Sequence, residues 1–233
     1  MVARRAGPVT VRFTEGVTRG FPVLRSLAGT KLAQGDLVQV AHEDRVESRL
    51  VFRFADGSVH DETAIYSQRG VFRLLAYRVV QRGPSFPETL EASIDRESGR
   101  YEVRYRGDED SPEQVLRGRF ELPDDSYNGL LTILLKNLEP GAVENVQIVA
   151  FTPKPRLVTI QLRAASEDPV LVGDVPMRAT RFLMRPQLGL FASLLVADIP
   201  DIKCWIVGGE APAFFRLEGP LYFMGPVWRI EPN

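Results

Sequence analysis

The chain has 233 residues, of which 44% are hydrophobic and 25% are charged, and its formal net charge is -1. This composition is that of a folded protein with an ordinary core, and the near-neutral charge gives no electrostatic case for binding nucleic acid. A single cysteine, Cys204, excludes an intramolecular disulfide and a cysteine-rich metal site. We expect one domain over residues 1–233, because all-β domains of this length are commonly single and no long linker divides the chain.

The first thirteen residues, MVARRAGPVTVRF, contain two adjacent arginines, Arg4 and Arg5, but no apolar segment after them. As given, they do not have the form of a signal peptide. No stretch of the chain is long and apolar enough to predict a transmembrane helix. Two locations are therefore open: the cytoplasm, or the periplasm or exterior if a leader has been removed.

Much of the chain alternates apolar and polar residues, as strands with one wet face do. In residues 45–54, RVESRLVFRF, the side chains of Val46, Phe52 and Phe54 lie on one face and the arginines lie on the other. Turn sequences such as ADGS and QRG separate these runs and predict a meander of antiparallel neighbours. The predicted strands cover residues 45–54, 59–67, 71–82, 115–122, 143–152 and 156–165, with a hairpin over 92–105 that turns at 96–99, and short strands fill the C-terminal part up to VWRIE.

Residues 122–141, LPDDSYNGLLTILLKNLEPG, change from the period of a strand to that of a helix. The spacing predicts a helix over residues 126–138, and Pro140 ends it close to Leu138. Its N-terminus needs a side chain that accepts backbone N–H groups, and acidic residues there suit the helix dipole. The candidates for this cap are Asp124, Asp125 and Ser126.

The apolar face of this helix is unusually wide, at roughly 200° against the ~100° stripe of a helix that lies on a flat surface. Its members are Tyr127, Leu130, Leu131, Leu134 and Leu138, with Ile133 and Leu135 on the flanks and Asn128, Gly129, Thr132 and Lys136 on the solvent side. A flat sheet cannot cover so wide an arc, whereas a bent one can. We therefore predict a mainly β fold: a single large, strongly curved antiparallel sheet, a half-barrel or open barrel, wrapped around one apolar helix. The trough is either filled completely by the core or partly open as an apolar pocket.

A second uncharged segment runs from Pro186 to Ala197, PQLGLFASLLVA. It is too short to span a membrane. Burial in the core explains it most simply. The alternatives are a lid over a ligand, or a patch that touches a membrane or an envelope protein peripherally.

The sequence offers little catalytic chemistry. Its two histidines, His42 and His60, would need carboxylates from elsewhere to hold zinc, so no metal site is expected. Neighbours such as His60 and Asp61 point to opposite faces of a strand, which bars a triad with Ser58. His60 and Glu62 do share a face and are the only plausible acid–base pair. No glycine pattern of a nucleotide site is present, and we expect no cofactor.

Six stretches carry a resemblance to known proteins: GPVTVRF, LVFRFADGSVHDETAIYSQRGVFRLL, GPSFP, the PDD…NGLL…LLKN segment, TPKPRLV, and GGEAPAFFRLEGPLY…GPVWRIE. Together they resemble an uncharacterised family of bacterial exported β-rich proteins, over nearly the whole chain. The shared motifs are turns and a helix, so the resemblance implies no site residues. The order of strands and helix is also similar, as a fold, to lipoprotein carriers of the cell envelope, in which a curved sheet surrounds a helical plug. The chain departs from the family in lacking a leader.

We expect a non-enzymatic protein of the bacterial cell envelope that binds or carries an apolar ligand, such as a lipid or an isoprenoid-like molecule. The candidate pocket wall consists of Phe52, Phe54, Leu130, Leu134 and Phe191. One alternative is a structural or assembly protein without a ligand. The other is an enzyme that uses His60 and Glu62 as acid and base.

Overall fold

The computed structural model describes residues 7–108, 110–152, 154–187, 201–222 and 224–233. The strands before the helix are β1 (Thr18–Gly20), β2 (Val23–Ser26), β3 (Lys31–His42), β4 (Arg45–Phe54), β5 (Val59–Ser67), β6 (Arg73–Arg82), β7 (Thr89–Asp95), β8 (Arg100–Arg106) and β9 (Gln114–Arg119). The helix and the strands that follow are α1 (Leu131–Asn137), β10 (Val143–Thr152), β11 (Lys154–Val172), β12 (Val175–Gln187), β13 (Ile202–Val207), β14 (Ala213–Gly219) and β15 (Trp228–Glu231).

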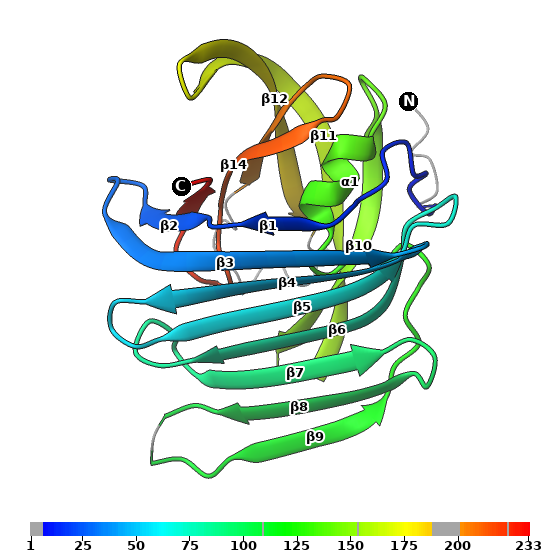
Figure 1. Ribbon diagram of the computed structural model, residues 1–233. Helices are drawn as coiled ribbons and strands as arrows, with labels where there is room; N and C mark the ends of the chain where they lie inside the picture. The colour runs from blue at the N-terminus through cyan, green and yellow to red at the C-terminus, as the bar shows by residue number, and fades with distance from the viewer. Residues whose placement is uncertain (1–6, 109, 153, 188–200, 223) are drawn as a thin grey trace.

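All of these strands belong to one antiparallel sheet in the order β10-β11-β12-β13-β14-β15-β2-β3-β4-β5-β6-β7-β8-β9, and β1 is added beside β3. The sheet is not closed, because β9 and β10 end the order and do not pair with each other. In Figure 1, β3 to β9 form a layer toward the viewer and β10 to β12 run behind it, with α1 at the upper end. Over the residues that the structure describes, this arrangement confirms the predicted fold class: mainly β, one helix and a single curved antiparallel sheet.

The core lies on the concave side of the sheet, where one face of each strand and the helix meet. The main cluster joins residues of β4 to β8, β10 to β13 and α1. Leu130 and Leu134 are fully buried, and the flanking Ile133 and Leu135 are buried as well. Apolar side chains on both flanks of α1 are thus hidden at once, which is what the width of its apolar arc required.

The helix is shorter than predicted, at seven residues instead of the thirteen of 126–138. The residues predicted to form its first part pair instead with the free edge of β10. The Tyr127 N–H donates to the Gln147 carbonyl at 2.9 Å, and the Gln147 N–H donates to the Asp125 carbonyl at 2.7 Å. The Asn128 side chain continues this pairing, since it bonds both the N–H and the carbonyl of Val149 at 2.8 Å. A sheet edge with unmet hydrogen bonds therefore competes with the helix for these residues.

Two further details of the predicted helix were wrong because its first part pairs with β10 instead of forming a helical turn. The cap is Leu130, which makes no side-chain cap bond, so none of the three polar residues at 124–126 caps the helix. Asp124 instead pairs with Arg73 and Arg96, and Asn128 is buried instead of facing solvent. The end of the helix was predicted correctly, because Asn137 is its last residue and Leu138 is extended.

The C-terminal strands β11 and β12 are longer than the short strands expected there. A proline inside an apparent strand normally argues against it. Pro169, however, lies beyond Arg163, the residue at which pairing with β10 stops. The remainder of β11 has a free edge on that side, where a missing N–H is tolerated.

Candidate functional site

The structure distributes the predicted pocket wall between two clusters. Phe52 and Phe54 pack with Phe86 and Trp228 in a second, aromatic cluster, whereas Leu130 and Leu134 belong to the main core. Phe191 lies outside the described residues. All four described residues are buried, so they belong to two packed regions of the core and do not form one continuous pocket wall.

His60 lies inside the aromatic cluster, only 3% exposed. Its Nδ1 atom is 3.1 Å from Nε2 of Gln81, which also donates to the Leu221 carbonyl at 3.1 Å. Because the amide nitrogen can only donate, Nδ1 accepts and the ring is held neutral. Burial lowers the pKa of His60, in agreement with this neutral state.

Glu62 shares the concave face with His60, as alternation predicts, but it is engaged elsewhere. Its Oε1 atom accepts a hydrogen bond from the Tyr77 hydroxyl at 2.6 Å. Burial and this carboxylate together raise the pKa of Tyr77 well above its ordinary value. The histidine ring is covered by Phe52 and Phe86, at centroid distances of 6.4 Å each. His60 is therefore shielded from a substrate, and the half-buried Glu62 is bonded to Tyr77.

The helix is too small to fill the trough that the sheet forms. A helix of seven residues is about 10 Å long, whereas the seven strands β3 to β9 span about 29 Å at their usual spacing. The helix packs against β13 and β14, at the end away from β7 to β9 in Figure 1. The concave face of β8 and β9 is consequently lined by side chains that the helix does not cover.

We call this region the β8–β9 apolar surface, defined by Tyr101, Tyr105 and Leu116. These residues share the concave face with Val103, which is completely buried, but they are only half-buried. Gly118, directly opposite Tyr101, makes room for the tyrosine ring, since a Cβ atom there would lie 2.8 Å from Cε1 of Tyr101. The glycine thus lets an aromatic ring lie across β9.

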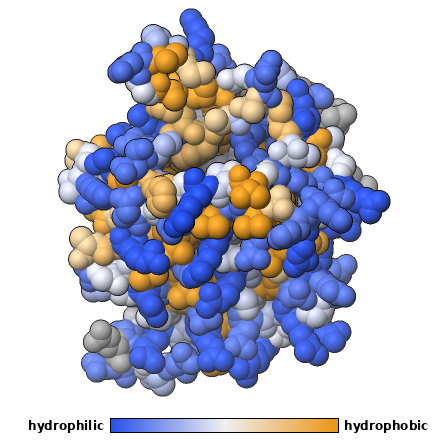
Figure 2. Space-filling model, in the orientation of Figure 1, coloured by the Kyte–Doolittle hydropathy of each residue, from blue (hydrophilic) through white to orange (hydrophobic). Residues whose placement is uncertain are grey.

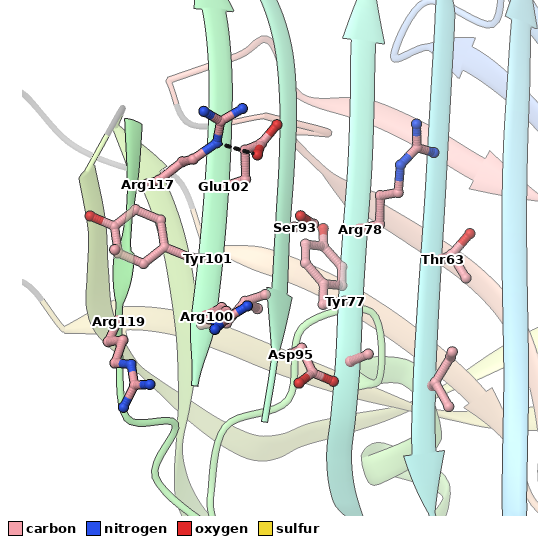
Figure 3. Close-up of a pocket in the computed structure, with 14 residues that line it drawn as sticks. Thr63, Tyr77, Arg78, Ser93, Asp95, Arg100, Tyr101, Glu102, Arg117 and Arg119 are labelled. Carbon is pink, nitrogen blue, oxygen red and sulfur yellow. Dashed lines mark hydrogen bonds and ion pairs between the residues drawn. The ribbon is translucent and has the colours of Figure 1, made fainter. Parts of the chain in front are cut away.

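The opposite, outer face of the same strands carries an open groove of about 800 Å³, shown in Figure 3. Two rows of side chains border it, and the pairing of β5 to β9 places the members of each row side by side. One row consists of Thr63, Arg78, Ser93, Glu102 and Arg117, and the other consists of Ile65, Ala76, Asp95, Arg100 and Arg119. Tyr77, Ile94, Tyr101 and Gly118, whose side chains or Cα atoms belong to the alternate positions of the strands, also border the groove. The alternation indicates that the residues of the two rows face outward, but it does not indicate that they meet.

The hairpin of β11 and β12 extends past its neighbours, because pairing with β10 stops at Arg163 and pairing with β13 stops at Ala179. Its tip, residues 170–177 with the sequence VLVGDVPM, is apolar yet exposed. Leu171 is 64% exposed and Val175 is 60% exposed. Figure 2 shows hydrophobic side chains on this projection at the top of the view.

Two chemical features are missing from the described part of the chain. No three His, Cys, Asp or Glu side chains gather there in a way that could hold a metal ion. In the same residues, no helix combines the length and hydropathy needed to cross a membrane. The segment from Pro186 to Ala197, where peripheral contact was predicted, lies mostly outside the described residues, and that prediction stays open.

Comparisons with known proteins add a likeness but no assigned function. No family model matches the chain, and no curated protein matches it. Among solved structures, it is similar to a β-barrel-like protein of the domain of unknown function DUF1849 from Brucella abortus, with 9% identity, a TM-score of 0.45 and 98% of each chain covered. That neighbour is a bacterial protein whose function is likewise unknown.

Proposed function

We propose that the protein is a non-enzymatic binding protein for an apolar molecule of the bacterial cell envelope, such as a lipid or an isoprenoid-like chain. The observation that carries this proposal is the half-burial of the β8–β9 apolar surface, on a face where Val103 and the inward residues of β7 are buried. A trough that a short helix fills at one end leaves apolar side chains at the other end. We place the ligand there, against Tyr101, Tyr105 and Leu116.

The driving force would be the removal of apolar surface from water, worth roughly 25 cal/mol for each Å² buried on either partner. The buried Val103 and the stacked rings of Tyr77 and Phe151, 6.2 Å apart, form the adjoining core. An apolar chain seated beside them would extend an existing core without requiring a new charged contact. The buried state of His60 favours this function over the acid–base enzyme.

The test compares two substitutions on neighbouring residues of β9. Leu116→Arg places a charge on the concave face, whereas Val115→Arg, at an outward-facing residue that is 40% exposed, leaves that face unchanged. We expect titration with a fluorescent fatty-acid probe to show saturable binding by the native protein and by Val115→Arg. Binding should weaken by at least about tenfold in Leu116→Arg, because a charge buried against an apolar chain costs more than 1.4 kcal/mol. Equal binding by both variants, or none by the native protein, contradicts the proposal.

The exposed hairpin tip favours a second candidate function, an assembly role without a ligand. Contiguous exposed apolar side chains mark interaction sites. Asp174 at the apex makes a bilayer an unsuitable partner, since a carboxylate in hydrocarbon costs about 3 kcal/mol. A protein surface can satisfy that carboxylate, and symmetric contact between two copies is the commonest form of assembly. The partner in this second proposal is therefore another copy of the chain.

Sedimentation velocity distinguishes this candidate. If the chain assembles through the hairpin tip, we expect a concentration-dependent dimer that becomes a monomer when Leu171 and Val175 are both changed to serine. Val143→Ser, at a residue that is 40% exposed and lies on β10, serves as the control and should leave the dimer intact. A native protein that stays monomeric at high concentration, or a dimer that survives the double substitution, would rule this role out.

A further inference from the structure

The outer groove contains two arginines that face each other and, among the described residues, form no ion pair with a carboxylate. Arg100 on β8 and Arg119 on β9 are directly opposite in the register, and both are exposed. Like charges opposite one another destabilise a pair of strands. Among the described residues, neither guanidinium lies within ion-pair distance of a carboxylate.

The acidic residues of the groove are occupied by other partners. Glu102 accepts from Arg104 and from Arg117, each at 2.6 Å, and these guanidinium groups lower the pKa of Glu102 to about 2. Asp95 accepts from the N–H and the hydroxyl of Ser98, at 2.8 and 2.6 Å. Glu102 is thus paired with other arginines, whereas Asp95 borders the groove as a carboxylate bonded to Ser98 and makes no ion pair with Arg100 or Arg119.

The middle of the groove has room for a ligand. Small side chains, Ala76 and Ser93, lie between longer ones in the two rows, and the Ser93 hydroxyl can donate to an anion. Arg119 also borders a second hollow of about 530 Å³ together with Arg73 and Arg96. Glu97, Glu121 and Asp124 line the same hollow, and Asp124 pairs with Arg73 and Arg96, so this second hollow has no excess of positive charge.

We propose that this groove binds an oxyanion, a phosphate or carboxylate group, between Arg100 and Arg119. The planar guanidinium fork matches the paired oxygens of such groups. An anion placed between the two arginines converts a repulsion into two favourable contacts. Arg100 and Arg119 lie on the outer face, whereas Tyr105 and Leu116 of the β8–β9 apolar surface lie on the concave face, and Tyr101 borders the groove as well. The proposed oxyanion site goes beyond the binding of an apolar molecule and does not depend on it.

The test measures the melting temperature in inorganic phosphate, in acetate and in chloride at equal ionic strength. The native protein should melt higher in phosphate or acetate than in chloride, because a ligand that binds the folded state stabilises it. A rise in phosphate alone assigns a phosphate group, and a rise in acetate alone assigns a carboxylate. Both outcomes support the oxyanion site, whereas no rise in either anion overturns it.

The substitution Arg119→Gln distinguishes anion binding from a purely structural role of this residue by its effect on the melting temperature. In chloride its melting temperature should equal or exceed that of the native protein, because a repulsion has been removed. The anion-dependent rise should need at least about tenfold more anion. Arg106→Gln, on the same face of β8 but outside the groove, is the control and should keep the full rise. A persistent rise in Arg119→Gln, a lower melting temperature in chloride, or an equal loss in Arg106→Gln would each overturn the proposal. The Leu116→Arg variant tests the other face, so the two proposals can fail separately.

Discussion

His60 is a titratable side chain enclosed by aromatic rings, and its burial makes the stability of the fold depend on pH. Burial lowers the pKa of His60 in the folded state below its ordinary value near 6.5. Above that value both the folded and the unfolded states hold a neutral ring. Below it the unfolded chain takes up a proton that the folded chain resists, so stability falls as the pH decreases toward the folded-state pKa.

The expected result is a loss of stability between pH 7.5 and pH 5 that is smaller in His60→Asn than in the native protein. Asparagine keeps an acceptor for the Gln81 amide but does not titrate, although the cavity it leaves lowers stability at every pH. His42→Gln, at an exposed residue, should retain the native pH dependence. Urea unfolding midpoints at the two pH values provide the measurement, and identical pH dependence in native protein and His60→Asn would show that the burial of His60 does not control it.

Among the elements, the segment before α1 has a structural role of its own as the cover of the β10 edge. Its backbone pairs with Gln147, and the Asn128 side chain satisfies both polar groups of Val149. An unsatisfied buried backbone group costs about 1–3 kcal/mol. The single buried amide thus replaces what a further strand would supply.

Asn128→Ala should therefore lower the free energy of unfolding by about 3 kcal/mol, because it leaves the N–H and the carbonyl of Val149 without partners. Thr132→Ala, on the half-buried side of α1, should cost no more than about 0.5 kcal/mol. Chemical denaturation of the three proteins checks this difference. Similar stabilities for both variants would mean that water replaces the lost amide contacts.

Strand boundaries followed from the sequence where alternation was strict. The predicted limits of β4, β5 and β10 agree with the structure, because each has one apolar and one polar face bounded by a turn. The start of α1 did not follow, since residues 125–128 respond to the edge of β10, a partner about twenty residues away. Local spacing cannot reveal that competition.

The candidate site was less predictable than the fold for a related reason. Hydropathy identified Leu130 and Leu134 as buried, but not that Phe52 and Phe54 pack in a different cluster. The encounter of Arg100 with Arg119 depends on the register of β8 and β9, which no pattern within either strand specifies. Alternation predicts a face, whereas register determines a neighbour.

At the scale of the whole molecule, the sheet remains open because its two end strands are protected in different ways and do not pair with each other. The edge of β10 is covered by residues 125–128. β9 is short and carries Arg117 and Arg119, charged residues of the kind that discourage pairing with another chain. β9, the end strand on this side, carries Leu116 of the β8–β9 apolar surface, so the proposed ligand would bind at this edge of the sheet.

The central claim is that an apolar ligand binds to the β8–β9 apolar surface. Methyl NMR spectra recorded during titration with a long-chain fatty acid test it most directly. The account predicts shifts in the methyl signals of Leu90, Ile94 and Leu116, on the concave face of β7 to β9, and none at Leu24 and Ile230 in the aromatic cluster. Shifts confined to Leu171 and Val175 would transfer the binding to the hairpin tip. Those shifts, or the absence of any shift, would contradict the proposed trough.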